Sequence, residues 1–418
     1  MAETLKVLYV TYDGLTDPLG QSQIIPYLAG LTGYGYKIHI LSCEKKNRFG
    51  EQKDMIAELL GKSNITWHPI PYTRKPPVLS TLYDICKLKS YARKLHKKQG
   101  FSIVHCRSYI AAFIGLDLKK KGGVKFIFDM RGFWADERVE GGLWNIKNPV
   151  YKTIYNYFKR KEQNFLIHAD FVITLTERAK TEIITNFNLK ERTTEIAVTP
   201  CCADTDFFSE KNVDEKEKNI LLDQLKINSG DLIISYSGSI GTWYMLSEML
   251  DFFKRLTEAY KNAKFLFITH DDPAKISDAV NKKNIDPDRI MIFSALRKQM
   301  PVLLSLTDIA LFFIIPVYSK MASSPTKMGE IMSMGIPFIT NSGVGDVDPF
   351  VERTGAGLLV KSFTDASYDE VIGKIPELLK LSPEKIRNMA MDEYSLHHGI
   401  SVYYNVYKRL TAPPQPLL

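Results

Sequence analysis

The sequence has no hydrophobic run long enough to cross a membrane. A spanning helix needs about 20 mostly apolar residues. The longest strongly apolar run, residues 309–317, has the length of a strand and ends at a Pro-Val-Tyr segment. Residues 1–6 lead directly into a strand pattern and do not resemble a signal peptide. We therefore expect neither a membrane span nor a secretory leader.

Cysteine is scarce as well. The five cysteines are an odd number, and no two of them have the Cys-x-x-Cys spacing of a zinc or redox motif. This pattern indicates neither a disulfide framework nor a metal site, and it favours a reducing cytoplasm. We expect no metal ligands.

The charge imbalance is small for a chain of this length. The 418 residues include 55 basic and 47 acidic side chains, for a net charge of +8. This balance indicates an anionic small molecule or an anionic membrane surface at least as readily as a nucleic acid. Of these partners, we expect no nucleic acid. The hydrophobic content of 45% is that of a folded protein, and the length predicts two to three domains at roughly 150 residues each.

Short β-branched and aromatic runs alternate with helical stretches along the whole chain. This alternation is typical of βα units around parallel sheets, so we expect an α/β fold. A helix is predicted over residues 22–31. The predicted strands are 6–12, 37–42, 65–72, 102–107, 124–129, 171–175, 195–198, 232–237, 264–268, 290–293, 309–314 and 337–340.

A polar, charged segment at residues 209–231 separates two halves of similar size and is the expected linker. We predict two Rossmann-like, doubly wound domains, residues 1–208 and 209–397, facing each other across a cleft. Ligands of open α/β sheets lie at the carboxyl ends of the strands. Function is therefore expected in the βα loops that line the cleft.

The first such loop, residues 13–22, contains Gly14 and Gly20 and opens a helix, where backbone amides can hold an anion. It lacks the glycine spacing and the acidic partner of a dinucleotide site. An ordinary connecting loop with a helix cap remains an alternative.

A second loop follows the strand that ends at Asp129. Arg131 could bind an anion through two hydrogen bonds, and Trp134 offers a stacking face for a sugar. Asp129, Asp136 or Glu137 could hold hydroxyl groups or accept a proton. A surface loop with a solvated ion pair and an anchored tryptophan is the alternative.

Residues 323–337 predict a short helix with Ser324 as its N-cap, Pro325 at its first position and Gly335 past its end. Lys327 and Glu330 are three residues apart and share a face near the helix N-terminus. The lysine suits a diphosphate and the carboxylate suits a ribose diol. A surface ion pair would have the same spacing.

Two further loops at strand ends contain glycines that allow a close approach of the backbone to a phosphate. One is residues 237–242, with Gly238 and Ser239, and the other is residues 341–346, with Gly343, Val344 and Gly345. Either loop alone is weak evidence. Together with residues 13–22 they would converge on one crevice.

Two basic segments, residues 87–98 and 151–161, could lie on an anionic membrane, and the second also contains aromatic residues. A solvated helix face is the equal alternative.

These loops together resemble the retaining nucleotide-sugar glycosyltransferases of glycosyltransferase family four. The resemblance runs nearly end to end, and its combination of motifs is specific although each motif alone is not. The matching residues are 17–23, 129–134, 199–204, 237–239, 325–327 with Glu330, and 343–346.

The resemblance implies the GT-B arrangement, with the acceptor bound mainly by the first domain and the donor mainly by the second. A C-terminal helix at residues 398–412 would pack back on the first domain. Glu330 matches the second glutamate of the family's E-x7-E motif, whereas Ala322 stands where the first belongs. Lys327, and after it Arg297 or Lys298, would supply the charge that binds the diphosphate. The donor site would then comprise Gly20, Gly238, Ser239, Arg297, Ser324, Thr326, Lys327, Glu330, Gly343, Val344 and Gly345, the acceptor site Asp17, Gln21, Trp134 and Asp136, and the catalytic group Asp129, Arg131, Lys327 and Glu330.

The resemblance also implies sugar transfer with retention at the anomeric carbon, with neither an obligatory divalent metal nor a cofactor. The donor would be a nucleotide diphosphate-sugar, and the acceptor a glycan or a lipid-linked sugar used in cell-surface polysaccharide synthesis. A nucleotide-sugar epimerase and a relative that binds the donor without turnover are the alternatives.

Overall fold

The computed structural model describes residues 5–187 and 194–412 as two compact units. Unit 1 comprises the chain up to Pro200 together with the chain from Leu396 onward, and unit 2 comprises Cys201–Ser395. None of the helices in the described residues is long and apolar enough to cross a membrane.

Unit 1 is built on a seven-stranded parallel sheet with the order β3-β2-β1-β4-β5-β6-β7. The order reverses between β1 and β4, which is the switch point where doubly wound sheets place ligands. The strands are β1 (Lys6–Thr11), β2 (Lys37–Glu44), β3 (Thr66–Pro71), β4 (Ile103–Arg107), β5 (Lys125–Asp129), β6 (Phe171–Thr174) and β7 (Glu195–Val198).

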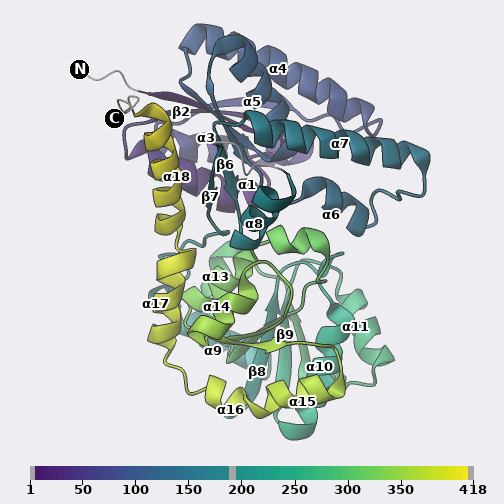
Figure 1. Ribbon diagram of the computed structural model, residues 1–418. Coiled ribbons are helices and arrows are strands. Elements are labelled where there is room, and N and C mark those ends of the chain that lie inside the picture. Colours follow the sequence, from purple (N-terminus) through teal and green to yellow (C-terminus); the bar gives the residue numbers. More distant parts are fainter. Residues whose placement is uncertain (1–4, 188–193, 413–418) are drawn as a thin grey trace, which may run out of the picture. The chain divides into compact units, whose positions relative to one another are not determined.

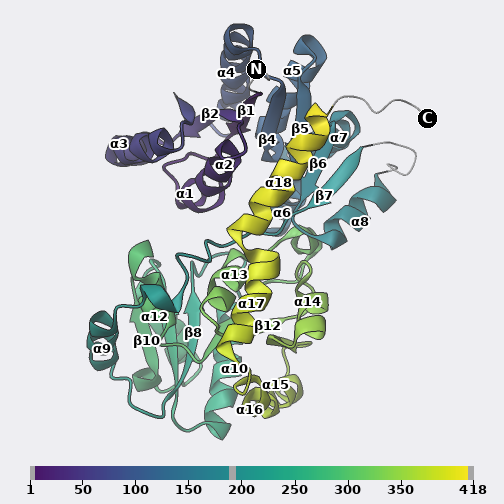
Figure 2. The ribbon, with the colours of Figure 1, turned by 90° about the vertical axis from the view of Figure 1, so that its left-hand side faces the viewer.

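The helices of unit 1 cover both faces of this sheet (Figures 1 and 2). Helices α4, α5 and α7 are neighbours on one face, and α18 packs against α2. The helices are α1 (Pro18–Gln23), α2 (Ile25–Thr32), α3 (Lys46–Lys62), α4 (Leu79–Gln99), α5 (Ser108–Gly122), α6 (Trp134–Glu140), α7 (Pro149–His168), α8 (Glu177–Asn186) and α18 (Leu396–Thr411).

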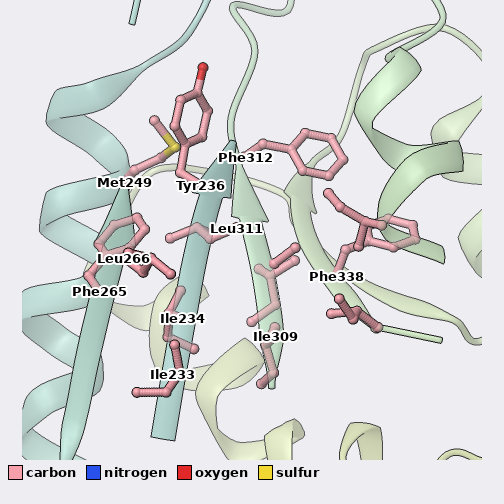
Figure 3. Close-up of a cluster of buried hydrophobic side chains, with 14 of the residues drawn as sticks. Ile233, Ile234, Tyr236, Met249, Phe265, Leu266, Ile309, Leu311, Phe312 and Phe338 are labelled. Carbon is pink, nitrogen blue, oxygen red and sulfur yellow. The ribbon is translucent and has the colours of Figure 1, made fainter. Parts of the chain in front are cut away.

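Unit 2 repeats the architecture with a six-stranded sheet, order β10-β9-β8-β11-β12-β13, whose switch point lies between β8 and β11. Its strands are near-continuous apolar runs because helices cover both faces. Figure 3 shows the resulting core around Ile234, Leu311 and Phe338. The strands are β8 (Leu232–Ser237), β9 (Ala263–Ile268), β10 (Ile290–Phe293), β11 (Ile309–Phe312), β12 (Phe338–Asn341) and β13 (Gly357–Val360).

The α-helices of unit 2 surround this sheet, and short 3-10 turns connect several of them. The α-helices are α9 (Glu215–Gln224), α10 (Leu246–Ala259), α11 (Pro273–Lys282), α12 (Met300–Leu304), α13 (Thr326–Ser333), α14 (Val347–Thr354), α15 (Asp365–Gly373), α16 (Ile375–Leu378) and α17 (Pro383–Tyr394). The 3-10 turns are η2 (Glu210–Asn212), η3 (Pro287–Arg289), η4 (Arg297–Gln299) and η5 (Tyr318–Ala322).

All twelve strands expected from the sequence are confirmed, with ends that shift by at most two residues. The last strand, Gly357–Val360, was missed because it is only four residues long and contains a glycine. The helix expected at 22–31 is two helices that meet at Ile24, whose backbone is not helical (φ −122, ψ −62).

The expected linker at residues 209–231 lies within unit 2 and includes regular structure. It contains α9, which Asp214 caps by accepting hydrogen bonds from the amides of Lys216 and Glu217, and Leu221 buries into the core. Figure 2 shows α9 next to α12. The division between the units falls after Pro200, before the expected boundary at residue 208. The high charge of α9 belongs to its solvent face, and this charge made the segment look like a linker.

Candidate functional site

The switch point of unit 2 contains a buried lysine between two tyrosine rings. Lys327 extends from the first turn of α13, and its Nζ lies 4.0 Å from the centroid of the Tyr236 ring and 3.8 Å from that of Tyr244. Phe312, the last residue of β11, lies further off at 5.9 Å. Tyr236 belongs to β8, so the lysine lies where the two central strands end.

Lys327 is buried, and its Nζ has no hydrogen-bond partner among the described residues. Burial lowers the pKa of Lys327 well below its usual value, and the nearby Glu330 carboxylate opposes this effect only in part. Tyrosine faces attract a cation but satisfy none of its three N–H donors. The ammonium group of Lys327 therefore has three N–H donors that could bind an anion, and it has no hydrogen-bond partner within unit 2.

Gly238 makes room for the lysine. Its backbone has φ 121, a conformation that side chains rarely allow, and a Cβ atom built there would lie 3.3 Å from Lys327 Nζ. The ring of Tyr236, two residues before Gly238, is held by a hydrogen bond of 2.5 Å that its Oη donates to the carbonyl oxygen of Ser239. The loop after β8 is thereby shaped around the ammonium group.

Glu330 lies one turn further along α13. Its Oε1 is 3.9 Å from Nη1 of Arg297, whose guanidinium lies over the rings of Phe207 and Phe208 at 5.0 and 5.5 Å. Burial raises the pKa of Glu330 to about 7, although Arg297 and Lys327 both act to lower it. The structure thus brings together Lys327, Glu330 and Arg297, the three charged donor-site residues expected from the sequence.

Helix α13 begins at Thr326 with Pro325 as its N-cap, one residue later than expected. Met328, Ile331 and Met332 form the buried stripe of this helix. Ser324 is not the cap; its Oγ accepts a hydrogen bond of 3.0 Å from the amide of Cys201.

The glycine-loop amides are largely engaged within unit 2. The Gly238 amide donates to the carbonyl of Ile268 at 2.9 Å, Gly343 donates to Asp348 at 2.9 Å, and Gly345 donates to the carbonyl of Lys320 at 2.9 Å. The Ile240 amide donates to Asp271. These loops are braced by their own unit, and the role of Gly238, Ser239, Gly343, Val344 and Gly345 as donor ligands stays a prediction.

The backbone amides of the first loop of unit 1 already bind a carboxylate side chain of the same unit. The Glu44 carboxylate is buried and accepts hydrogen bonds from the amides of Leu15 at 2.8 Å and Thr16 at 3.2 Å. A Cβ atom at Gly20 would collide with the Gly14 carbonyl oxygen. Close packing therefore explains why residue 20 is a glycine. Contact of Gly20 with the nucleotide-sugar donor stays a prediction.

The switch point of unit 1 contains a buried ionic cluster around Asp129. Its Oδ2 accepts a hydrogen bond of 2.6 Å from Tyr403 Oη, and Nε2 of His105 is 3.4 Å away. Arg107 and Arg131 approach the same carboxylate at 4.0 and 3.9 Å. Burial alone would raise the pKa of Asp129, but Arg131, His105 and Arg107 lower it to about 2. Asp129 and Arg131 are thus together, as expected.

The expected acceptor residues are held by contacts within unit 1. Asp136 accepts hydrogen bonds from Tyr155 and Lys159, both at 2.8 Å, and Asp17 pairs with Lys45 at 2.8 Å. Gln21 donates to Gln52 at 2.7 Å. Trp134 lies in an aromatic cluster; its partners there are Tyr109, Trp144 and Phe158. Contact of these four residues with an acceptor stays a prediction.

Several residues at the two switch points were not predicted from the sequence. Tyr236 and Tyr244 frame Lys327, and Arg107 and Tyr403 surround Asp129. The position of Arg107 at the end of a strand could have marked it as a site residue. Tyr403 could not be linked to Asp129 in this way, because 274 residues separate the two in the sequence. Among the described residues, no three His, Cys, Asp or Glu side chains come together as metal ligands.

Two family models cover most of the chain, each matching one half. The model for Glycosyltransferase Family 4 matches residues 27–207, and that for Glycosyl transferases group 1 matches residues 217–395. The chain belongs to glycosyltransferase family 4. It is an enzyme of sugar transfer with the GT-B fold. No curated protein matches it by sequence.

Solved structures share the fold of this glycosyltransferase at low identity. A glycosyltransferase from Rickettsia africae is 16% identical with a TM-score of 0.72, over 99% of this chain and 100% of that one. Anabaena HepE in complex with UDP-glucose is 12% identical with a TM-score of 0.67, over 97% and 99%. A putative UDP-N-acetylglucosamine 2-epimerase from Listeria monocytogenes is 12% identical with a TM-score of 0.56, over 100% and 99%.

Proposed function

We propose that this glycosyltransferase transfers a sugar, with retention at the anomeric carbon, from a nucleotide diphosphate-sugar to a glycan or lipid-linked acceptor in cell-surface polysaccharide synthesis. The observation that carries the proposal is Lys327, a buried cation without a hydrogen-bond partner in unit 2, at the point of the sheet where such folds bind ligands. A departing diphosphate needs such a cation.

In this mechanism Lys327 binds the diphosphate and stabilises the charge that grows on it as the sugar leaves. Ammonium donors placed in advance at the leaving group lower the barrier because they need no reorganisation during the reaction. Glu330 accepts hydrogen bonds from the ribose hydroxyls, and Arg297, which lies 3.9 Å from the Glu330 carboxylate, supplies a second positive charge to the diphosphate. Asp129 and Arg131 of unit 1 act on the sugar and the acceptor.

The acceptor is proposed to be bound by unit 1, through Asp17, Gln21, Trp134 and Asp136. We place the enzyme in the cytoplasm, in peripheral contact with the inner face of the membrane, on the basis of its two basic segments. HepE, whose structure contains UDP-glucose, supports a uridine nucleotide as the first donor to test.

Thermal unfolding with UDP and GDP tests the binding step. A ligand at 100 times its Kd stabilises the protein by about 2.7 kcal/mol. We expect one nucleotide to raise the Tm of the wild type, and Lys327→Met to lose the shift while it stays folded. Transfer from a panel of radiolabelled UDP- and GDP-sugars then tests turnover. An unchanged shift in Lys327→Met would refute the site.

A relative that binds a nucleotide-sugar without turnover is the second candidate. Ala322, at the position of the first motif glutamate, is buried in unit 2. Its methyl group supplies no carboxylate. A Tm shift with UDP together with neither transfer nor donor hydrolysis would favour this candidate over an enzyme.

A further inference from the structure

Half of the large exposed apolar side chains of the described chain lie in two short segments of unit 1. Nine of eighteen fall between residues 78 and 91 or between 143 and 157. The most exposed are Leu79 and Val150, each 64% exposed, and Leu143, 61% exposed. Single exposed apolar residues need no explanation, but a concentration of this kind marks an interaction surface.

The two segments lie toward the same edge of the sheet. Helices α4 and α7 have 21 and 20 residues, about 30 Å each, whereas a strand of five residues spans only about 17 Å. Both helices end just before the next strand begins, so their N-terminal turns extend past the carboxyl edge. We call six residues at these ends the apolar rim: Val78, Leu79, Leu82, Leu143, Ile146 and Val150.

The helices that bear the rim are strongly basic. Helices α4, α5 and α7 carry thirteen Lys and Arg against three acidic residues, an excess of +10, while the whole chain has only +8. The three acids are already paired, Asp84 with Lys87, Asp117 with Arg93 and Glu162 with Lys159. The remainder of the chain is therefore slightly acidic, and the positive charge is concentrated on these three helices.

The three helices form one continuous face. Lys89 of α4 and Lys161 of α7 both approach the ring of Phe113 in α5, at 5.6 and 6.0 Å from its centroid. Figure 1 shows the three helices as neighbours. We call this surface the basic face.

Helix ends explain only part of this charge. Lys97, Lys98 and Lys119–Lys121 stand in last turns, where cations complement the helix dipole. Lys89 and Lys161 stand mid-helix, and Lys152 stands in the first turn of α7, where the dipole disfavours a cation. These positions indicate an anionic partner.

We propose that the basic face lies on an anionic membrane, with the apolar rim inserted at the depth of the lipid headgroups. A lipid surface uses both parts, because basic residues bind anionic headgroups and aliphatic side chains enter the acyl boundary. A nucleic acid would contact only the cations. Docking of this kind turns the carboxyl edge of the unit 1 sheet toward the bilayer, so the acceptor is membrane-borne. This last step rests on the proposed function.

Sedimentation with lipid vesicles tests the proposal on the full chain. The wild type is expected to bind vesicles that contain phosphatidylglycerol, to dissociate in high salt, and to ignore pure phosphatidylcholine. Lys152→Glu/Arg160→Glu/Lys161→Glu should weaken binding by roughly fivefold or more per charge. Leu79→Ser/Leu82→Ser/Leu143→Ser/Ile146→Ser should also weaken it, but without changing the salt dependence.

Matched variants in unit 2 serve as controls. Lys211→Glu/Lys216→Glu/Lys282→Glu changes three exposed lysines, and Ile220→Ser/Leu379→Ser changes two exposed apolar residues. Both should bind vesicles like the wild type. A wild type that stays in the supernatant at low salt overturns the proposal, and so does equal loss in the controls.

Two further readouts separate this proposal from others. If the rim variant binds vesicles as the wild type does, and both bind single-stranded RNA equally well, the face is only a site for polyanions and the membrane proposal fails. The Tm shift with UDP should survive in every face variant, because donor binding lies in unit 2. A wild type whose Tm is shifted by neither UDP nor GDP would refute the proposed function and leave the docking result intact.

Discussion

The ammonium group of Lys327 lies 3.8 Å from the centroid of the Tyr244 ring. Because the lysine has no hydrogen-bond partner among the described residues, its charge is stabilised only by the aromatic faces and, in part, by the nearby Glu330 carboxylate. An arrangement of this kind is unfavourable for folding and becomes favourable once an anion binds. Lys327 should therefore separate stability from function more clearly than any other residue of unit 2.

Lys327→Met is expected to stabilise the fold and to abolish activity. Methionine keeps the chain length and removes a buried polar group that costs about 1–3 kcal/mol, so the free energy of unfolding should rise. Transfer should fall by at least about 100-fold, the usual effect of deleting one charge-stabilising donor. Urea unfolding and initial-rate assays measure the two effects. A variant that is both less stable and fully active would contradict this assignment.

Glu330 gives a pH dependence of stability with a defined sign. Its pKa in the folded protein is about 7, above the ordinary 4.5, so the folded state binds the proton more tightly than the unfolded state. This contribution is complete below pH 4.5 and is lost as the pH rises through 7. In Glu330→Gln this loss is absent, so the variant should gain stability relative to the wild type between pH 4.5 and 7.5. Urea midpoints across that range provide the measurement.

The matched control for this experiment is Glu217→Gln, which changes a carboxylate on α9 that accepts a hydrogen bond from Gln299. Its stability difference from the wild type should not follow the pH profile of Glu330→Gln. A flat difference for Glu330→Gln over the same range would show that the Glu330 carboxyl titrates normally.

Tyr403→Phe should destabilise unit 1 through Asp129. The phenol donates a 2.6 Å hydrogen bond to a fully buried carboxylate, and a bond to a charged group contributes about 1.5–3 kcal/mol. Asp129 stabilises the fold above its ordinary pKa of 3.8, and this contribution is lost as the pH falls toward 2. Without the phenol the pKa of Asp129 should rise, so the loss with acid should begin at a higher pH.

Tyr404→Phe on the same helix is the control, since the described contacts of Tyr404 are ring contacts with Tyr34 and Tyr36. Acid and urea unfolding of both variants gives the comparison. Equal behaviour of the two would mean that the Asp129 hydrogen bond adds nothing to stability.

The sequence alone was sufficient for the architecture, because alternating apolar runs and helices are local patterns. Lys327 and Glu330 were also predictable, since their spacing on one helix is local. The aromatic frame of Lys327 was not, because Tyr244 approaches it from a loop between β8 and α10 whose path depends on tertiary packing. The use of Glu44 to fill the first loop was missed for the same reason: a carboxylate on the neighbouring strand competes with any ligand for these amides.

Transfer is expected to need no divalent cation. In the proposed mechanism Lys327 and Arg297 neutralise the diphosphate, so chelation with EDTA should leave the initial rate unchanged. Added Mg²⁺ should give at most a small effect through the free nucleotide. Loss of activity in EDTA with full recovery on Mg²⁺ would show that the metal, and not the two side chains, carries the leaving-group charge.

Gly238→Ala tests whether the loop after β8 is shaped for the ammonium group. A Cβ atom would meet Lys327 Nζ at 3.3 Å, and the φ of 121 is strained for alanine. Gly230→Ala is the matched control, because Gly230 has φ 93 but nothing within 4 Å of the added Cβ. Both should lose about 1 kcal/mol or more of stability from backbone strain. Only Gly238→Ala should also weaken the UDP-induced Tm shift, because it displaces the lysine. If the two variants bind UDP equally well, the approach of Gly238 to Lys327 has no part in donor binding.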